Sequence, residues 1–319
     1  MVKILVNDGI HPDGQLLLEE ANYIVDTDKI PQQDLPKQLP QYDVIIVRSA
    51  TKVRKDLIDL CPNLKVIARG GVGLDNIDVE YAQSKGITVI NTPAASSQAV
   101  AELAMGHIFT LTRNLHHLNR KMPIEGNENF KTLKSTYAKG FQIKGKTLGI
   151  LGFGRIGQSL AKMAIGLGMN VLAVDPYIEN ATISISPYGY DKINFCIKIN
   201  TVSMDDMLKK SDFISIHVPG DQSVIGKAEI AKMKQGVFLI NTSRGGSINE
   251  DDLLEGLNSG KIAGAALDVF SNEPTPRKDI LSHPNISFSS HIGAETLEAQ
   301  ANIGLELADK IIAYFGDDL

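Results

Sequence analysis

Cysteine is scarce in this sequence, with only Cys61 and Cys196 among 319 residues. The two lie far apart and outside any Cys-x-x-Cys pair, so we expect neither a disulfide framework nor a metal site. No apolar run approaches the roughly 20 residues of a membrane helix, and the first residues lack the apolar core and cleavage site of a signal peptide. The 32 basic and 37 acidic side chains nearly balance, which argues against a non-specific nucleic-acid binder. These absences predict a cytoplasmic protein that binds a small molecule rather than membranes or nucleic acid.

The sequence does contain enough apolar material for a large core. Hydrophobic residues make up 43% of it, which is ample for two domains. Short β-rich runs alternate with helical stretches, as is typical of the α/β class. Most of these runs are continuously apolar, as expected of parallel strands that helices cover on both faces. The predicted strands are residues 2–7, 42–48, 64–69, 87–91, 147–152, 171–175, 213–218, 237–242, 265–270 and 286–290.

An amphipathic helix is predicted for residues 97–122. At a rise of about 1.5 Å per residue it would reach roughly 35–40 Å, long enough to pass from one domain to another. The alternative is one more helix that covers a sheet. Apolar residues recur here at spacings of three and four, as such a helix requires, at Val100, Leu103, Ala104, Ile108, Leu111, Leu115 and Leu118.

A glycine-rich motif follows the strand predicted at 147–152 and precedes a helical stretch. It reads Gly152-x-Gly154-x-x-Gly157. The first glycine permits a tight turn, the second lets the backbone approach a pyrophosphate, and the third lets helix and strand pack closely. Amides at the helix N-terminus would then face the phosphates. Alone, such a motif can be a plain tight turn, but its position between strand and helix predicts a dinucleotide site.

An acidic residue stands where this site needs one. Asp175 ends the next predicted strand, 23 residues after Gly152, where a carboxylate should bind the ribose hydroxyls of the adenosine. The same carboxylate would repel a 2′-phosphate, so NAD is favoured over NADP. The alternative for Asp175 is a turn former ahead of Pro176. A methyltransferase could share the sheet, but it would not explain the polar residues downstream.

Hydride transfer from an alcohol carbon requires a base for the hydroxyl proton and a cation to hold the substrate. Such groups collect after the carboxyl ends of strands in open α/β sheets. Of seven histidines, His217 and His291 remain as candidates there, and spacing does not choose between them. Arg244 lies in a tight turn after a strand, where it can clamp a carboxylate, and Glu273 can orient an imidazole. The alternatives are a surface salt bridge for Arg244 and an exposed loop acid for Glu273.

Five segments together resemble the D-isomer-specific 2-hydroxyacid dehydrogenase family. The likeness runs over nearly the whole chain, in the order of the family, and implies an enzyme that uses NAD. The segments are RGGVGLDNID (69–78), GKTLGILGFGRIG (145–157), DFISIHVP (212–219), INTSRGGSINEDDLLEGLNSGKIAGAALDVFSNEP (240–274) and HIGAETLEAQ (291–300).

The resemblance implies a catalytic role for three residues. It identifies Arg244 as the substrate anchor, Glu273 as the acid of a catalytic pair, and His291, rather than His217, as the acid/base. The segment around His217 resembles a loop that lines the cofactor.

The resemblance also implies the contacts of cofactor and substrate. Asp268 would hold the nicotinamide carboxamide, and the amides of Arg155 and Ile156 the pyrophosphate. Further cofactor contacts are expected at Val218, Thr242, Ser243, Gly293 and Ala294, and substrate contacts at Gly70, Gly71 and Val72.

The fold that we expect is α/β with two doubly wound parallel-sheet domains. A Rossmann NAD-binding domain, residues 98–292, is inserted into a flavodoxin-like substrate-binding domain of residues 1–97 and 293–319. The resemblance further implies a homodimer built around the helix at 97–122. NAD-binding transcriptional corepressors of the same fold are a non-enzymatic alternative, which measured turnover would exclude.

Residues 45–53, IIVRSATKV, resemble the branch of the family that acts on D-3-phosphoglycerate in serine biosynthesis. In that branch the arginine and serine, here Arg48 and Ser49, lie near the substrate. Phosphate recognition needs several cationic donors, although each candidate can instead be a solvated surface charge. Glyoxylate or hydroxypyruvate reduction is the competing prediction, because it uses the same catalytic residues. The further cationic candidates are Lys52, Arg69 and Arg113.

The sequence departs from the family pattern at several points. Ser290 stands where a proline usually precedes the catalytic histidine, and Glu295 replaces a small residue and places a charge near the pocket. Residues 178–200 bear little likeness to the family, and we predict a covering strand at 193–199. Because the sequence ends at Leu319, we expect no regulatory amino-acid-binding domain like that of longer relatives.

Overall fold

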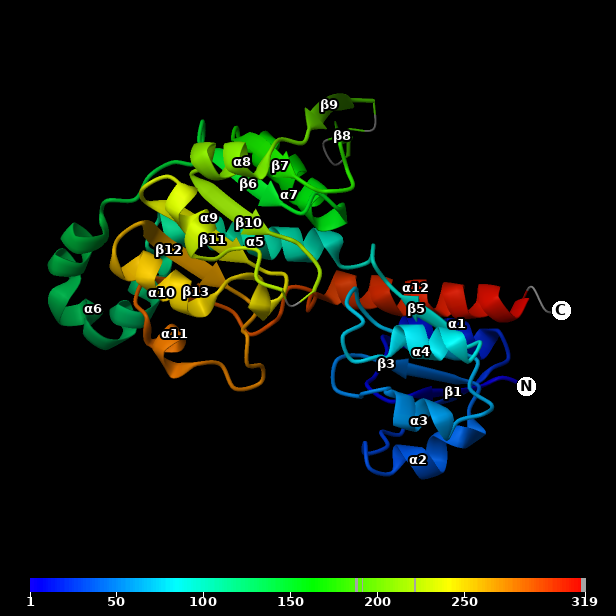
Figure 1. Cartoon of the computed structure of the whole chain (residues 1–319). Helices are drawn as coiled ribbons and strands as arrows, with labels where there is room; N and C mark the ends of the chain where they lie inside the picture. The colour runs from blue at the N-terminus through cyan, green and yellow to red at the C-terminus, as the bar shows by residue number, and fades with distance from the viewer. Residues whose placement is uncertain (187–188, 191, 221, 317–319) are drawn as a thin grey trace. The chain divides into compact units, whose positions relative to one another are not determined.

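The chain forms two compact units in the computed structural model, which describes residues 1–186, 189–190, 192–220 and 222–316. Unit 1 consists of Met1–Ala99 and the residues from Ala294 onward, and unit 2 of Val100–Gly293. The first boundary falls inside helix α5 (Ser97–Thr112). In Figure 1 the N-terminal strands (blue) and the C-terminal helix α12 (red) both belong to unit 1. The boundaries predicted from the sequence are after residues 97 and 292.

Unit 1 is built on a five-stranded parallel sheet with the order β2-β1-β3-β4-β5. This is the order of flavodoxin-like sheets, and ligands of such sheets bind where the order reverses, between β1 and β3. The strands are β1 (Lys3–Val6), β2 (Ile24–Asp26), β3 (Val44–Val47), β4 (Val66–Arg69) and β5 (Thr88–Asn91).

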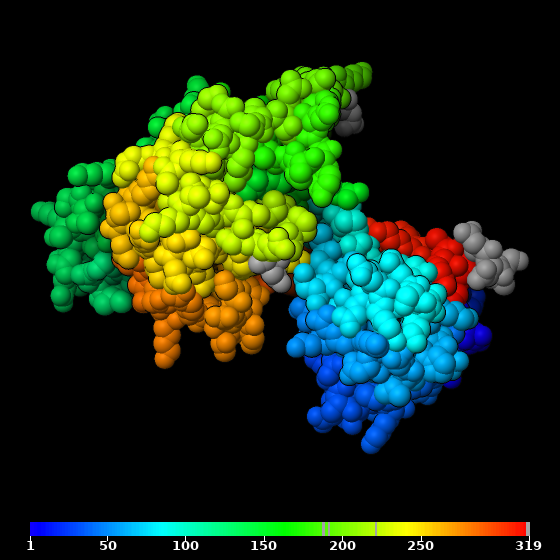
Figure 2. All heavy atoms as spheres, in the orientation of Figure 1, coloured from blue at the N-terminus to red at the C-terminus, as the bar shows by residue number. Residues whose placement is uncertain are grey.

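Both faces of this sheet are buried. Successive residues of a strand point to opposite faces, and Leu5 of β1 belongs to one apolar cluster while Ile4 belongs to the other. The short helices cover the first face, and α1 and α12 cover the second, where Figure 2 shows α12 (red) against the N-terminal part of unit 1 (blue and cyan). The helices are α1 (Pro12–Glu20), α2 (Leu35–Gln38), η1 (Leu39–Gln41), α3 (Lys55–Asp59), α4 (Val79–Ser84) and α12 (Leu297–Gly316).

Unit 2 is built on a six-stranded parallel sheet with the order β13-β12-β11-β10-β6-β7. A Rossmann sheet carries one more parallel strand beside β7, and here a single bridge between Ala173 and Thr201 takes that place. The strands are β6 (Thr147–Leu151), β7 (Asn170–Val174), β10 (Phe213–Ile216), β11 (Val237–Asn241), β12 (Ile262–Leu267) and β13 (Ile286–Phe288).

Helices cover both faces of this sheet as well. The neighbours Ile150 and Leu151 of β6 belong to different apolar clusters, one beneath α5 and α7 and the other beneath α8 to α11. This two-sided burial explains why the predicted strands are continuously apolar. The helices are α7 (Arg155–Gly166), α8 (Met204–Lys210), α9 (Lys227–Lys232), η2 (Gly245–Ser247), α10 (Glu250–Asn258) and α11 (Lys278–Ser282).

The prediction of one helix over residues 97–122 is wrong. The chain forms two helices, α5 and α6 (Leu115–Tyr137), separated at Asn114, whose φ of 55° and ψ of 28° are left-handed. Asparagine adopts this conformation more readily than most residues. The apolar spacing continues across the break, so periodicity alone could not reveal it. Figure 1 shows α6 apart from the sheet of unit 2, and its side chains Ile124 and Phe130 are exposed.

The ten predicted strands are all present, although their ends differ and β12 begins three residues earlier than predicted. The strand predicted at 193–199 is β9 (Phe195–Asn200), which forms an antiparallel hairpin with the unpredicted β8 (Asn180–Ile185). Residues 187, 188 and 191 of this region lie outside the described residues. In the described part of the chain, no helix has both the length and the apolar character to cross a membrane.

Candidate active site

The glycine-rich turn after β6 has the geometry that its motif predicts. Gly152 has a φ of 94°, and a Cβ there would lie 2.5 Å from the carbonyl oxygen of His217. A side chain at Gly157 would overlap the carbonyl oxygen of Gly152, so only glycine allows helix and strand to pack this closely. The Cβ position of Gly154 has nothing within 4 Å, so the backbone is open to a ligand there. Arg155 and Ile156 begin α7, where helix amides lack helical acceptors.

Asp175 follows β7 and lies beside this turn. One carboxylate oxygen accepts a hydrogen bond from the backbone N–H of Phe153 at 2.8 Å, and the other accepts from Tyr177 and Ile178. These three bonds fix the carboxylate next to the glycine-rich turn. A carboxylate has about four acceptor sites, so the ribose hydroxyls predicted to bind here can still donate to it.

The turn after β11 carries the next predicted cofactor residues. Asn241 ends the strand and holds the turn, because its side chain accepts from the amide of Ser243 and donates to the carbonyl oxygen of Arg244. The hydroxyl oxygen of Thr242 is buried without a hydrogen-bond partner among the described residues. Buried hydroxyls are normally paired. The orphan hydroxyl and the open backbone at Gly154 therefore fit a site built for a dinucleotide. Val218 follows β10, the neighbouring strand.

The clearest candidate for a catalytic group is an imidazole–carboxylate pair in unit 2. His291 Nδ1 lies 2.7 Å from Glu273 Oε2, and Glu273 Oε1 accepts from the backbone N–H of Phe270 at 2.9 Å. A carboxylate at Nδ1 assigns the proton of a neutral imidazole to that nitrogen and leaves Nε2 to exchange a proton with a substrate. The side chain of His291 is 52% exposed, so a substrate can reach it.

Arg244, Glu273 and His291 follow three strands that are neighbours in the sheet, β11, β12 and β13. The carboxyl ends of parallel strands meet at one edge, so the structure brings the three loops together. A side chain at Gly245 would overlap the backbone of Phe270, which shows how closely the first two loops pack. The guanidinium of Arg244 donates from Nη1 to the carbonyl oxygen of Ser243 at 2.8 Å.

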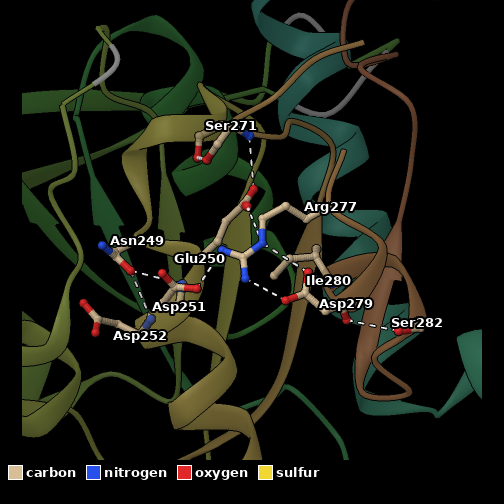
Figure 3. A network of polar contacts seen from close by, with 10 residues as sticks. Asn249, Glu250, Asp251, Asp252, Ser271, Arg277, Asp279, Ile280 and Ser282 are labelled. Atoms are coloured by element: carbon tan, nitrogen blue, oxygen red, sulfur yellow. Dashed lines mark hydrogen bonds and ion pairs between the residues drawn. The ribbon is translucent and has the colours of Figure 1, made fainter. Parts of the chain in front are cut away.

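A polar network anchors the loop that carries Glu273 (Figure 3). Glu250, buried in the first turn of α10, accepts from the backbone N–H of Ser271 at 3.1 Å. Arg277 binds the carboxylates of Asp251 at 2.7 Å and Asp279 at 2.6 Å, and lies 3.9 Å from Glu250. Both ends of the loop are thus tied to α10 and α11.

Asp268 is completely buried and its carboxylate holds the loop of His291. It accepts from the Ser289 hydroxyl at 2.6 Å and from the amides of Ile292 and Gly293 at 3.0 Å each. A Cβ on Gly293 would lie 3.2 Å from the same carboxylate. Ala294 begins the return to unit 1, and its carbonyl oxygen accepts from Gln300.

His217 has a different environment from His291. Its Nε2 lies 2.8 Å from the hydroxyl of Ser215, and its Nδ1 is shielded from solvent without a partner among the described residues. Burial lowers the pKa of His217 to about 4. Among the described residues no carboxylate contacts this ring, which supports the choice of His291 as the acid/base.

The predicted substrate residues Arg48 and Ser49 lie in unit 1. They follow β3 and line a pocket of about 390 Å³ with Asp8, Lys29 and Glu295. The pocket lies at the carboxyl ends of β1 and β3, where the strand order reverses and ligands of such sheets bind. The carboxylate of Glu295 forms an ion pair with Arg48. Asp8 accepts from the amides of Arg48 and Thr51 and from the Thr51 hydroxyl.

Gly70, Gly71 and Val72 follow β4, the strand next to β3. The Gly70 amide donates to the carbonyl oxygen of Val47, and the Gly71 amide donates to the Thr92 hydroxyl at 2.8 Å. Two of the three predicted donors thus serve unit 1 itself, and the Val72 amide is the one we expect to meet a substrate.

Sequence reasoning missed several residues of this site. Lys29 lines the pocket in unit 1, whereas Lys52 does not. Nothing in a single sequence links Lys29, in a loop after β2, to Arg48. Glu250 and His107 were also missed. Each is a buried polar residue at a helix position whose spacing predicts an apolar side chain. That mismatch was the available signal.

Comparisons with known proteins identify the family of this chain. Residues 105–293 match the family model described as D-isomer specific 2-hydroxyacid dehydrogenase, NAD binding domain. The chain is 43% identical to hydroxypyruvate reductase of Thermotoga maritima, and the match covers 98% of both chains. It is 41% identical to D-3-phosphoglycerate dehydrogenase of Methanocaldococcus jannaschii, with 98% of this chain and 57% of that protein covered. The chain thus spans little more than half of this second relative.

Solved structures show the same fold. A glyoxylate reductase from Paecilomyes thermophila has a TM-score of 0.83 at 27% identity, with 99% of this chain and 96% of that one covered. An NAD⁺-bound 3-phosphoglycerate dehydrogenase from Entamoeba histolytica has a TM-score of 0.78 at 26% identity, with 100% and 96% covered.

The glycine-rich turn, the aspartate after β7 and the imidazole–carboxylate pair together define a dinucleotide-dependent oxidoreductase. The chain belongs to the D-isomer-specific 2-hydroxyacid dehydrogenase family, and its cofactor is NAD.

Proposed function

We propose that the protein oxidises D-3-phosphoglycerate to 3-phosphohydroxypyruvate, a step of serine biosynthesis. The observation that carries the reaction type is the 2.7 Å contact between His291 Nδ1 and Glu273 Oε2. The support for the phosphorylated substrate is the pocket at the β1/β3 reversal, which offers Arg48, Lys29 and Ser49 as donors. In this proposal unit 1 is the substrate-binding domain and unit 2 the cofactor-binding domain.

The residues of unit 2 divide the chemistry among them. NAD, when bound, supplies the acceptor for the hydride. Arg244 holds the substrate carboxylate by charge-assisted hydrogen bonds. His291 accepts the C2 hydroxyl proton at Nε2, and Glu273 stabilises the imidazolium that forms. In the reverse direction His291 returns that proton to the C2 oxygen.

The cofactor contacts proposed from the sequence fit this scheme. The amides at the start of α7 would meet the pyrophosphate and Asp175 the ribose. Asp268 already accepts three hydrogen bonds from the chain, so its first role is to hold the loop of His291. The carboxylate has room for one further donor, such as the nicotinamide carboxamide.

A second candidate is the reduction of hydroxypyruvate or glyoxylate. One observation favours it: Arg48 is paired with Glu295, which offsets the positive charge that a phosphate would need. The hydroxypyruvate reductase of Thermotoga maritima also matches this chain over 98% of its length. The catalytic residues are the same in both reactions, so only the pocket in unit 1 distinguishes them.

We also propose a homodimer in the cytoplasm. The support is the exposed apolar surface of α6, where Ile124 is 86% and Phe130 is 56% exposed. Light scattering after size-exclusion chromatography tests the assembly. A monomer at micromolar concentration would contradict it.

The experiment that tests the proposed function is NADH formation from D-3-phosphoglycerate, D-glycerate and D-lactate under identical conditions. We expect a higher kcat/KM for the phosphorylated acid, and loss of that preference in Arg48→Ala. Equal kcat/KM values for the three acids would refute the substrate and leave the reaction type intact. Absence of turnover with any hydroxy or keto acid would favour an NAD-binding corepressor.

A further inference from the structure

The buried histidine of α5 is bonded to the segment that leads into the loop of His291. His107 is only 6% exposed and lies in unit 2. Its Nδ1 lies 3.1 Å from the hydroxyl of Ser287, and its Nε2 lies 2.9 Å from the hydroxyl of Ser289. Ser287 belongs to β13, and Ser289 follows that strand two residues before His291.

The donors and acceptors of these side chains allow only one order of hydrogen bonds from His107 to Asp268. The Ser289 hydroxyl donates its single proton to the carboxylate of Asp268, which only accepts. Ser289 must therefore accept from His107, so the ring carries its proton on Nε2. Nδ1 then accepts from the Ser287 hydroxyl. Burial lowers the pKa of His107, in keeping with the neutral ring that this order requires.

The far end of the chain of contacts is the anchor of the catalytic loop. Asp268 holds the amides of Ile292 and Gly293 through its carboxylate, and its carbonyl oxygen accepts from the amide of His291 at 2.7 Å. His291 itself has a φ of 57°, in the left-handed region. A non-glycine residue keeps this conformation only where its surroundings determine it.

We infer that His107 is a positioning residue for His291, acting through Ser289 and Asp268. It orients the Ser289 hydroxyl, which in turn fixes the carboxylate around which residues 291–293 are bonded. The inference rests on the proposed role of His291 as the acid/base. The neighbouring core positions of α5, Ala104, Ile108 and Leu111, are filled by apolar residues. A residue that only filled the core would not need the hydrogen bonds that His107 makes to the two serines.

The two ends of the imidazole allow a matched test. His107→Gln can place an amide nitrogen near the position of Nε2 and keep the link to Ser289. His107→Asn reaches only the position of Nδ1 and keeps the link to Ser287. Ser289→Ala and Ser287→Ala remove the same two links from the other side. Thermal melting shows whether each variant is folded.

We expect Ser289→Ala and His107→Asn to lower kcat about ten- to a hundredfold, the range in which small misplacements of a catalytic group fall. Their KM for hydroxy acid and their affinity for NADH should change less than about twofold, because His107 is buried and neither it nor Ser289 is among the residues proposed to bind a ligand. Ser287→Ala and His107→Gln should keep kcat within about threefold of the parent. A purely structural role would instead produce losses that follow the melting temperature in all four variants.

Hydrogen exchange of the Ile292 and Gly293 amides supplies a readout that does not need turnover. Exchange should accelerate in Ser289→Ala and not in Ser287→Ala. Unchanged kcat and unchanged exchange in Ser289→Ala would overturn the inference, as would equal effects of the two serine variants. A different result would refute the proposed function: full turnover in His291→Ala would exclude His291 as the acid/base. The faster exchange of the Ile292 and Gly293 amides in Ser289→Ala would then still be observed.

Discussion

Replacing Glu295 by glutamine should improve the enzyme for a phosphorylated substrate. Glu295 forms an ion pair with Arg48 at the pocket of unit 1, and the two side chains are 42% and 32% exposed. A phosphate that binds Arg48 competes with this carboxylate for the guanidinium. Ion pairs this exposed contribute about 0.2–1 kcal/mol. Because 1.4 kcal/mol corresponds to a tenfold change, releasing Arg48 should lower the KM for D-3-phosphoglycerate by about 1.4- to fivefold.

The assay measures initial rates of NADH formation from D-3-phosphoglycerate and from D-glycerate. Glu295→Gln should leave the KM for D-glycerate unchanged, because an uncharged hydroxyl does not compete for Arg48. Glu298→Gln is the matched control, since it removes the same charge from an exposed position on α12. An unchanged or higher KM for the phosphorylated acid in Glu295→Gln, or an equal change in Glu298→Gln, would refute this reasoning.

Three further predictions concern the cofactor turn, the pocket and a buried histidine. Gly154→Ala should weaken NADH binding at an unchanged melting temperature, because the added Cβ meets nothing in the protein. Gly157→Ala should instead lower the melting temperature, because its Cβ overlaps the carbonyl oxygen of Gly152. Fluorescence titration measures the binding and calorimetry the melting, and equal behaviour of the two variants would contradict this prediction. Arg48→Ala should raise the KM for D-3-phosphoglycerate about tenfold or more, because it removes one charge-assisted hydrogen bond. A KM within twofold of the parent would contradict the proposal that this pocket binds the phosphate. Burial lowers the pKa of His217 from 6.5 to about 4, so between these pH values the unfolded chain binds a proton at this residue and the folded protein does not. The free energy of unfolding should therefore fall by about 1–3 kcal/mol between pH 7 and pH 4. Urea unfolding should show a weaker pH dependence in His217→Gln, and an identical slope would contradict the assignment.

The features that could be predicted from the sequence are those encoded within a few residues. The glycine-rich motif needs only strand, turn and helix in order, and Gly152, Gly154 and Gly157 have the geometry expected of them. Continuous apolar runs likewise predicted the ten strands, because both sheets are covered on both faces. Asn114 shows the limit: one left-handed residue ends a helix without disturbing the apolar spacing around it.

Contacts between distant residues could not be predicted in this way. Glu295 was recognised as a charge near a pocket, but its partner Arg48 is 247 residues away. His107 was not a candidate in the sequence, because its contact with Ser289 joins residues 182 apart and appears only in the folded chain. The choice of His291 over His217 came from family resemblance, and the structure adds the physical reason: His291 has a carboxylate partner, whereas His217 contacts the hydroxyl of Ser215.

The central claim is that His291, oriented by Glu273, exchanges the proton of the reaction. The most direct test compares single-turnover hydride transfer and NADH affinity in His291→Asn and His217→Asn. We predict that His291→Asn slows hydride transfer by about 10²- to 10⁴-fold while the Kd of NADH stays within about twofold, and that His217→Asn keeps most of the rate. Rapid hydride transfer in His291→Asn, or a larger loss in His217→Asn, would contradict the account.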